Sequence, residues 1–186
     1  MKYAMNMIKR FFIFCILLLQ LQTMEAQFTR ADLQATGLTC ALCSNAINKA
    51  LGILPFVASV KADIKNSSFS IVFKPGASVN PDEISKAVED AGFFVGSLQL
   101  TGTFSGLEVK PGGLVKIGQY WFRFYKPGLN KLTGQTVKLM DKSFLTAKEF
   151  KKISAGAVPS LKTGRAERGM EKDGIKSGER IYHISN

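Results

Sequence analysis

Alternating hydrophobic and polar residues mark the first part of the chain as a series of short strands. Ala31, Leu33 and Ala35 alternate with polar neighbours, which predicts a half-buried strand. The same period of two recurs over residues 56–64 and again over residues 69–73, with polar residues between the two runs. This pattern predicts a β-hairpin.

Two helices are predicted around this hairpin. Ala46, Ile47, Ala50, Leu51 and Leu54 recur at helical spacing before the hairpin. After it, Asn80 is the expected N-cap, with Pro81 at the first helical position and Glu83 at the capping-box position, and Gly92 ends the helix. Residues 93–100 supply a last strand. The resulting order, βαββαβ, is that of a ferredoxin-like domain in the α+β class.

The second part of the chain predicts a small, mostly β domain over residues 101–186, with an OB-like barrel as one candidate. Short apolar runs between Gly and Pro residues predict its strands, and residues 144–153 predict one short helix. Residues 162–180 are polar, charged and rich in glycine, which predicts a flexible loop. Within residues 119–128 we expect Tyr120, Phe122 and Phe124 to face the core and Trp121 and Tyr125 to be available for contacts.

Charge is distributed unevenly between these two parts. Residues 27–100 hold six basic and six acidic residues, whereas residues 101–186 hold sixteen basic and seven acidic residues. This asymmetry predicts two modules with a boundary near Leu100. The basic module fits an acidic partner or peripheral contact with an anionic membrane surface; an exported protein meets little nucleic acid, so we expect no nucleic-acid partner.

The N-terminus has the features of a secretory signal peptide. Basic residues precede an apolar run over residues 11–21, and Ala26 offers a small residue for cleavage. An uncleaved anchor is the alternative, but the run is well short of the ~20 apolar residues of a spanning helix. We therefore expect residues 1–26 to be removed and the mature protein to be periplasmic or secreted. Of the three cysteines, Cys15 would leave with the peptide.

The two remaining cysteines, Cys40 and Cys43, lie between the first predicted strand and the first helix. Unpaired N–H groups and the helix dipole at a helix start stabilise a thiolate. Two thiolates at this spacing can share one soft metal ion.

Residues 27–100 resemble the heavy-metal-associated domain of copper chaperones, copper-transporting ATPases and periplasmic mercury-binding proteins. The residues that carry the resemblance are Gly37, Thr39, Cys40 and Cys43 in GLTCALC, and Gly92 with Phe93 in EDAGF. It implies that Cys40 and Cys43 bind the metal. Leu38, Thr39 and Phe93 would surround them, although the family most often has methionine at the position of Leu38.

The small number of available ligands favours Cu(I) over zinc and the other soft metal ions. A structural zinc site takes four ligands, the single histidine, His183, lies far along the chain, and Thr39 stands where a zinc-selective site would have an acidic residue. Two thiolates suit two-coordinate Cu(I); Hg(II), Ag(I) and Zn(II) remain alternatives. The sequence thus predicts an exported copper carrier that exchanges metal with a donor or acceptor protein.

Other functions for the cysteine pair stay open. An extracytoplasmic thiol–disulfide oxidoreductase would use the same two residues, and a Hg(II) or Ag(I) scavenger would use the same site. The pair could also form an ordinary structural disulfide, or be vestigial in an adhesion or scaffolding module. No Ser/His/Asp arrangement, phosphate loop or carboxylate pair is evident at a convincing spacing, so we expect no enzyme.

Overall fold

The computed structural model describes residues 27–38, 41–104, 107, 109–110, 112–125 and 136–185. Residues 1–26, on which the signal-peptide prediction rests, lie outside this set, as do Thr39 and Cys40. No helix among the described residues is long and apolar enough to cross a membrane.

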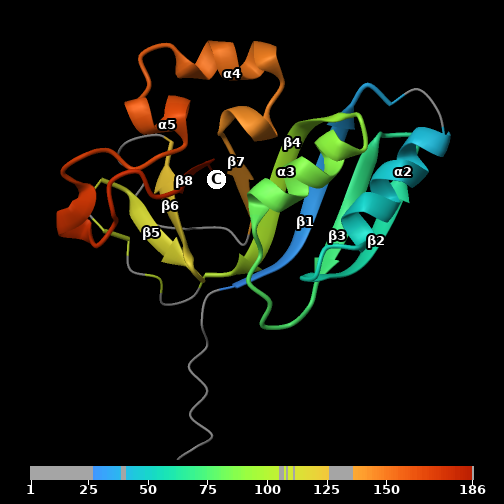
Figure 1. Cartoon of the computed structure of the whole chain (residues 1–186), viewed down its shortest axis with the longest axis horizontal. Helices are drawn as coiled ribbons and strands as arrows, with labels where there is room; N and C mark the ends of the chain where they lie inside the picture. The colour runs from blue at the N-terminus through green and yellow to red at the C-terminus, as the bar shows by residue number, and fades with distance from the viewer. Residues whose placement is uncertain are drawn as a thin grey trace, which may run out of the picture.

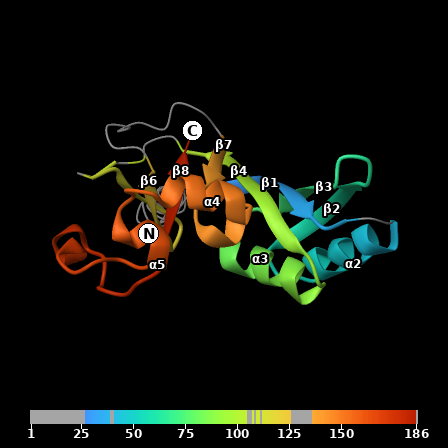
Figure 2. The same ribbon diagram turned by 90° about the horizontal axis from the view of Figure 1, so that it is seen from above.

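The first half of the chain confirms the predicted βαββαβ order, and with it the α+β class. Its elements are β1 (Gln27–Thr36), α2 (Ala41–Gly52), β2 (Val57–Asp63), β3 (Ser68–Phe73), α3 (Pro81–Asp90) and β4 (Phe94–Thr103). The helices α2 and α3 lie along one face of the strands (Figures 1 and 2).

Local signals in the sequence explain these elements. Asn80 caps α3 as predicted, because its side-chain oxygen accepts a hydrogen bond from the backbone N–H of Asp82 at 3.1 Å. Ala31, Leu33 and Ala35 all point into the core, in agreement with the period of two. Gly92 follows α3 with a φ of +88°, a conformation that favours glycine at the end of a helix.

The second half adds four strands and several short helices. Its elements are β5 (Leu114–Ile117), β6 (Tyr120–Phe124), β7 (Thr136–Leu139), the 3₁₀ turn η1 (Lys142–Phe144), α4 (Ala147–Ser154), α5 (Pro159–Thr163), the 3₁₀ turn η2 (Met170–Asp173) and β8 (Ile181–Ser185). The predicted helix over residues 144–153 is thus present as α4, preceded by η1. Thr146 and Glu149 form a complete capping box at its start.

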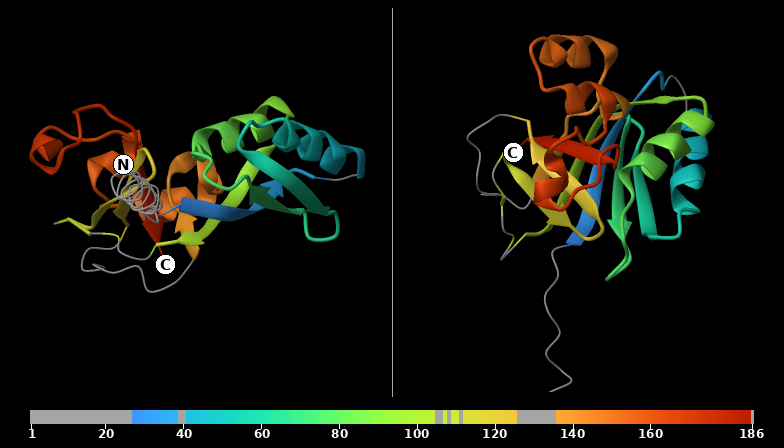
Figure 3. Two further views of the ribbon diagram at one scale, coloured as in Figure 1. Left: turned by 90° about the horizontal axis from the view of Figure 1, so that it is seen from below. Right: turned by 60° about the vertical axis from the view of Figure 1, so that its left-hand side comes forward.

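All eight strands belong to one sheet, in the order β2-β3-β1-β4-β7-β8-β6-β5. The strands β4 and β7 pair antiparallel through Gln99, Leu100 and Thr101, whereas β6 and β8 are parallel. The predicted boundary near Leu100 therefore falls inside β4. Among the described residues the strands of the second half extend the sheet of the first half, so the OB-like arrangement is not confirmed (Figures 1 and 3).

One hydrophobic core crosses the predicted boundary. Phe28 of β1 stacks edge-to-face on Phe122 of β6, with ring centroids 5.4 Å apart, and Phe122 in turn stacks on Tyr182 of β8 at 5.3 Å. The same cluster of buried residues contains Ile47 of α2 and Ile84 of α3. Packing thus joins the two halves as firmly as strand pairing does.

One prediction for the second half was wrong. Trp121 is only 6% exposed, because it packs into a second cluster with Leu114, Ala166, Ile175 and Ile181. The segment 162–180 has Ala166 and Ile175 in this cluster and contains η2, and its flexibility stays a prediction. Two isolated apolar residues gave too weak a periodic signal for this packing to be predicted.

Candidate metal centre

The candidate metal loop begins with a sharp turn after β1. Gly37 has a φ of +85°, a conformation that residues with a side chain rarely adopt. The next residue, Leu38, is half-buried and packs against the main core, which agrees with its expected place beside the site. Thr39 and Cys40 lie outside the described residues. The loop therefore begins with Gly37, whose backbone conformation favours glycine, and Leu38, which packs against the core.

Cys43 lies in the first turn of α2, as predicted, and is half-buried. That turn carries no acidic side chain, so the unpaired N–H groups and the helix dipole act on the sulfur without an opposing carboxylate from the same turn. Leu42, directly before it, is 80% exposed. The start of α2 thus presents an apolar side chain to solvent beside the cysteine.

Cys43 is disulfide-bonded, and the structure therefore describes an oxidised form of this site. The other two cysteines, Cys15 and Cys40, lie outside the described residues. Because a metal ligand must be a thiolate, reduction of this bond has to precede any metal binding by Cys43.

Phe93 stands beside the start of the loop. A Cβ atom placed on Gly37 would lie 3.9 Å from Cδ1 of the Phe93 ring. The backbone N–H of Phe93 donates to the carbonyl of Val88 at 3.1 Å, which holds the backbone of Phe93 at the end of α3. Phe93 is half-buried against the main core, so it contributes to packing and at the same time lies next to the loop.

Among the described residues, no group of three His, Cys, Asp or Glu side chains is placed to hold a metal ion. His183 is fully buried in β8. Its Nδ1 lies 3.1 Å from Oδ1 of Asp141, and its Nε2 lies 3.0 Å from Oγ of Ser160. Both ring nitrogens are therefore engaged away from the loop.

These contacts form a Ser-His-Asp arrangement that the sequence analysis did not find. The arrangement could not be recognised from the sequence, because three separate segments supply Asp141, Ser160 and His183. The backbone N–H of His183 also donates to Asp141 at 2.7 Å, and Arg123 donates to Oγ of Ser160 at 3.3 Å. Ser160 and His183 are both 0% exposed, which leaves no room for a substrate at Oγ. The arrangement is therefore a buried polar network that joins η1, α5, β6 and β8.

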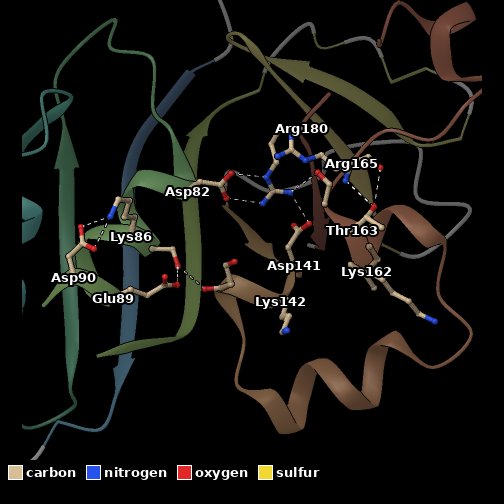
Figure 4. A pocket seen from close by; sticks show the side chains of 14 residues that line it. Asp82, Lys86, Glu89, Asp90, Asp141, Lys142, Lys162, Thr163, Arg165 and Arg180 are labelled. Carbon is tan, nitrogen blue, oxygen red and sulfur yellow. Dashed lines mark hydrogen bonds and ion pairs between the residues drawn. The ribbon is translucent and has the colours of Figure 1, made fainter. Parts of the chain in front are cut away.

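A second polar network connects the second half to α3 (Figure 4). Arg180 donates two hydrogen bonds to Asp82, at 2.7 and 2.8 Å, and one to Asp141 at 3.2 Å. Burial of Arg180 opposes its charge, but the hydrogen bonds that it donates to Asp82 and the charges of Asp141 and Asp82 outweigh burial and raise the pKa of Arg180. This bidentate pair fixes Arg180 to the start of α3.

Tyr182 completes this contact. Its ring lies under the guanidinium of Arg180, 4.0 Å from ring centroid to Cζ, and its hydroxyl donates to Oδ1 of Asn80 at 3.1 Å. Burial, followed by the charge of Asp82, raises the pKa of Tyr182 above its ordinary value. Asn80 therefore caps α3 and receives a hydrogen bond from β8 at the same oxygen.

Comparison with known proteins identifies the first half of the chain. Residues 32–94 match the model of the heavy-metal-associated domain. A probable copper-transporting ATPase of Arabidopsis thaliana is 37% identical over 65 residues, which are 35% of this chain and 6% of the ATPase. This chain thus spans only a small part of that relative.

Two solved structures each match about a third of this chain. The CopZ metallochaperone is 25% identical with a TM-score of 0.34, and the match covers 36% of this chain and 98% of that one. A domain of the yeast copper transporter, solved in apo and Cu(I) states, is 27% identical with a TM-score of 0.32 and coverages of 36% and 90%. From the family match and the ATPase relative, residues 32–94 are a heavy-metal-associated domain.

Proposed function

We propose that this protein carries a soft metal ion, Cu(I) in the first place, on Cys40 and Cys43 and passes it to a partner protein outside the cytoplasm. The observation that carries the proposal is the place of Cys43 in the first turn of α2, within a heavy-metal-associated domain. The apolar run over residues 11–21 supports export by a signal peptide. We further propose that the protein is a carrier and not an enzyme.

Release of the metal follows from a two-thiolate site. A thiolate or thioether of the partner can add as a third ligand before either original bond breaks, because two-coordinate Cu(I) accepts another soft ligand. We assign Cys40 as the ligand that leaves first, since Cys43 is held by the start of α2. The exposed side chain of Leu42 offers the incoming protein an apolar contact next to the exchange point.

Replacement of each cysteine tests this assignment. We expect Cys43→Ser to abolish tight Cu(I) binding and Cys40→Ser to weaken it by more than about a hundredfold, because losing a ligand costs more than the 10–100-fold of a change around the ligands. A colorimetric Cu(I) chelator in competition with the reduced protein measures the affinity. Asn45→Ser, on the exposed side of α2, is the matched control and keeps the wild-type affinity. Equal affinity in wild type, both single variants and the double variant would refute the site.

The disulfide of Cys43 favours a second candidate function, thiol–disulfide exchange. Both functions need the reduced pair, but they differ in what protects it. For a carrier, we expect one equivalent of Cu(I) to block alkylation of the thiols by iodoacetamide, with mass spectrometry counting the modified cysteines. An oxidoreductase supplied with dithiothreitol would instead reduce a disulfide substrate repeatedly, because the reductant restores the cysteine pair that each turnover oxidises to a disulfide, and a copper chelator would leave the rate unchanged. Such turnover would replace the carrier proposal.

A further inference from the structure

Two clefts lie next to each other between α3 and the segment that follows β7. One has a volume of about 510 Å³ and the other of about 450 Å³, and both are lined by Glu89, Lys142 and Ser143. They therefore form one groove, bounded by α3 on one side and by η1, α4 and α5 on the other. We call it the α3 groove; its far part, which ends at Arg165, is the one seen in Figure 4.

The near end of the α3 groove lies beside the candidate metal loop. Thr36, the last residue of β1, lines this end and is followed directly by Gly37 of the loop. Phe94 also lines it and follows Phe93, whose ring lies next to Gly37. The near end of the groove thus lies beside Gly37, where the candidate metal loop begins.

The near part of the groove has an apolar floor and an exposed aromatic rim. Val95 and Leu145 are buried beneath it, whereas Phe94 is 69% exposed. Large apolar side chains that remain this exposed beside a cleft are typical of contact sites for another chain. The floor can therefore take an apolar side chain of a partner.

Positive charge follows the wall opposite α3. Residues 142–168 contain seven basic and two acidic residues, a net charge of +5. Lys142 and Lys162 are exposed, line the groove and have no ion-pair partner among the described residues. The lysines of α4 add to this charge, and those that are exposed are Lys148, Lys151 and Lys152.

The carboxylates of the groove are largely occupied. Asp82 and Asp141 are bound by Arg180, and Asp90 pairs with Lys86 at 2.8 Å. Glu89 accepts a hydrogen bond from Ser85 at 3.0 Å and makes no ion pair among the described residues. The lining of the groove thus holds five basic and four acidic side chains, a net charge of +1, and the excess positive charge lies with Lys142, Lys162 and Arg165 on the wall opposite α3.

We infer that the α3 groove is the docking site for an acidic, extended segment of the protein that exchanges metal with Cys40 and Cys43, an inference that rests on the function proposed above. The concave shape selects a chain segment over a flat membrane surface, which cannot reach the floor between the helices. A second copy of this protein is disfavoured, because residues 27–186 carry 22 basic and 13 acidic residues, a net charge of +9.

The inference is tested with a defined acidic probe. Fluorescein-labelled hexaglutamate is titrated with the purified chain under reductant, and fluorescence anisotropy gives the Kd; labelled hexaglutamine is the uncharged control. Lys142→Glu with Lys162→Glu reverses the charge of the wall, and Lys61→Glu with Lys65→Glu makes the same charge change at the β2-β3 hairpin. We expect the first double variant to raise the Kd for hexaglutamate by about tenfold and the second by less than about threefold, because each exposed pair contributes about 0.2–1 kcal/mol.

Amide chemical shifts locate the probe. On addition of hexaglutamate, the amides of Phe94, Lys142 and Ser143 are expected to shift, and those of the β2-β3 hairpin to stay unchanged. Equal weakening by both double variants, or shifts centred outside the groove, would overturn the inference. So would vesicles of phosphatidylglycerol that bind in a manner sensitive to Lys142→Glu and Lys162→Glu while hexaglutamate does not. Cu(I) affinity is measured on wild type and on the same variants. If wild type does not bind Cu(I), the carrier function is refuted. If every variant binds Cu(I) with the wild-type affinity, the substitutions affect docking alone.

Discussion

Arg180 and Tyr182 connect the second half of the chain to the start of α3. Arg180 binds Asp82 in the first turn of α3, and Tyr182 donates to Asn80, the N-cap itself. Both contacts are partly buried, the side chain of Arg180 being 20% and that of Asp82 43% exposed, and the charges of Arg180 and Asp82 strengthen the hydrogen bonds between them. The start of α3 therefore depends on side chains that lie about a hundred residues later in the chain, the separation from Asp82 to Arg180 being 98 positions.

Alkaline pH is expected to weaken this contact through Tyr182. Because the folded-state pKa of Tyr182 is raised above its ordinary value of 10.0, the unfolded chain loses the phenol proton first. The stabilisation is complete below pH 10 and falls as pH rises toward the folded pKa, by about 1.4 kcal/mol per pH unit for one proton. Urea unfolding at pH 9, 10 and 11 measures the free energy of unfolding.

Two phenylalanine substitutions make this measurement specific. Tyr182→Phe loses the hydrogen bond to Asn80 and about 1 kcal/mol at neutral pH, but its stability should fall less steeply above pH 10. Tyr120→Phe, at a half-buried position of β6, is the matched control and keeps the wild-type slope. An identical slope in Tyr182→Phe and wild type would show that the phenol does not titrate in this range.

At the scale of single elements, sequence reasoning succeeded where the determining contacts are local. The period of two in β1 and the cap of α3 involve residues a few positions apart, and both are confirmed. The place of Cys43 in the first turn of α2 also follows from local sequence, because the strand before it and the helix after it were both predictable. These features need no knowledge of what lies across the sheet.

Features of the second half that depend on distant contacts could not be predicted. The register of β4 with β7 joins Leu100 to Val137, and no pattern in either strand specifies that pairing. Trp121 alternates with core residues along β6, yet it is buried because the segment that contains Ile175 covers the other face of the strand. The α3 groove arises in the same way, since its two walls come from residues that are far apart in the sequence.

For the whole molecule, the continuous sheet and core predict one cooperative unfolding transition, in contrast to the separable modules that the charge distribution suggested. Trp121 is the single tryptophan and reports on the second half, whereas the two longest described helices, α2 and α3, make the largest helical contribution to far-UV circular dichroism. We expect urea unfolding curves from tryptophan fluorescence and from circular dichroism to coincide.

A second variant shows whether the junction itself provides this coupling. Arg180→Ala removes a largely buried partner of Asp82 and Asp141 and should destabilise the protein by about 3–5 kcal/mol. Lys176→Ala, an exposed basic residue of the same segment, is its control. If the tryptophan fluorescence of the wild type changes at a clearly lower urea concentration than its circular dichroism, the two halves of the chain unfold independently.

The position of β8 has a consequence for the order in which this protein can be made. Ile181–Ser185 is the last strand in sequence, but it lies inside the sheet between β7 and β6. The first four strands can pair once residue 103 has emerged from the ribosome, because all their partners are then present. Among the described residues, the hairpin of β5 and β6, in contrast, pairs with the rest of the sheet only through β8, so it waits until residues 181–185 arrive. The half that contains the heavy-metal-associated domain can therefore form early, whereas completion of the groove beside it waits until Arg180 and β8 have been made.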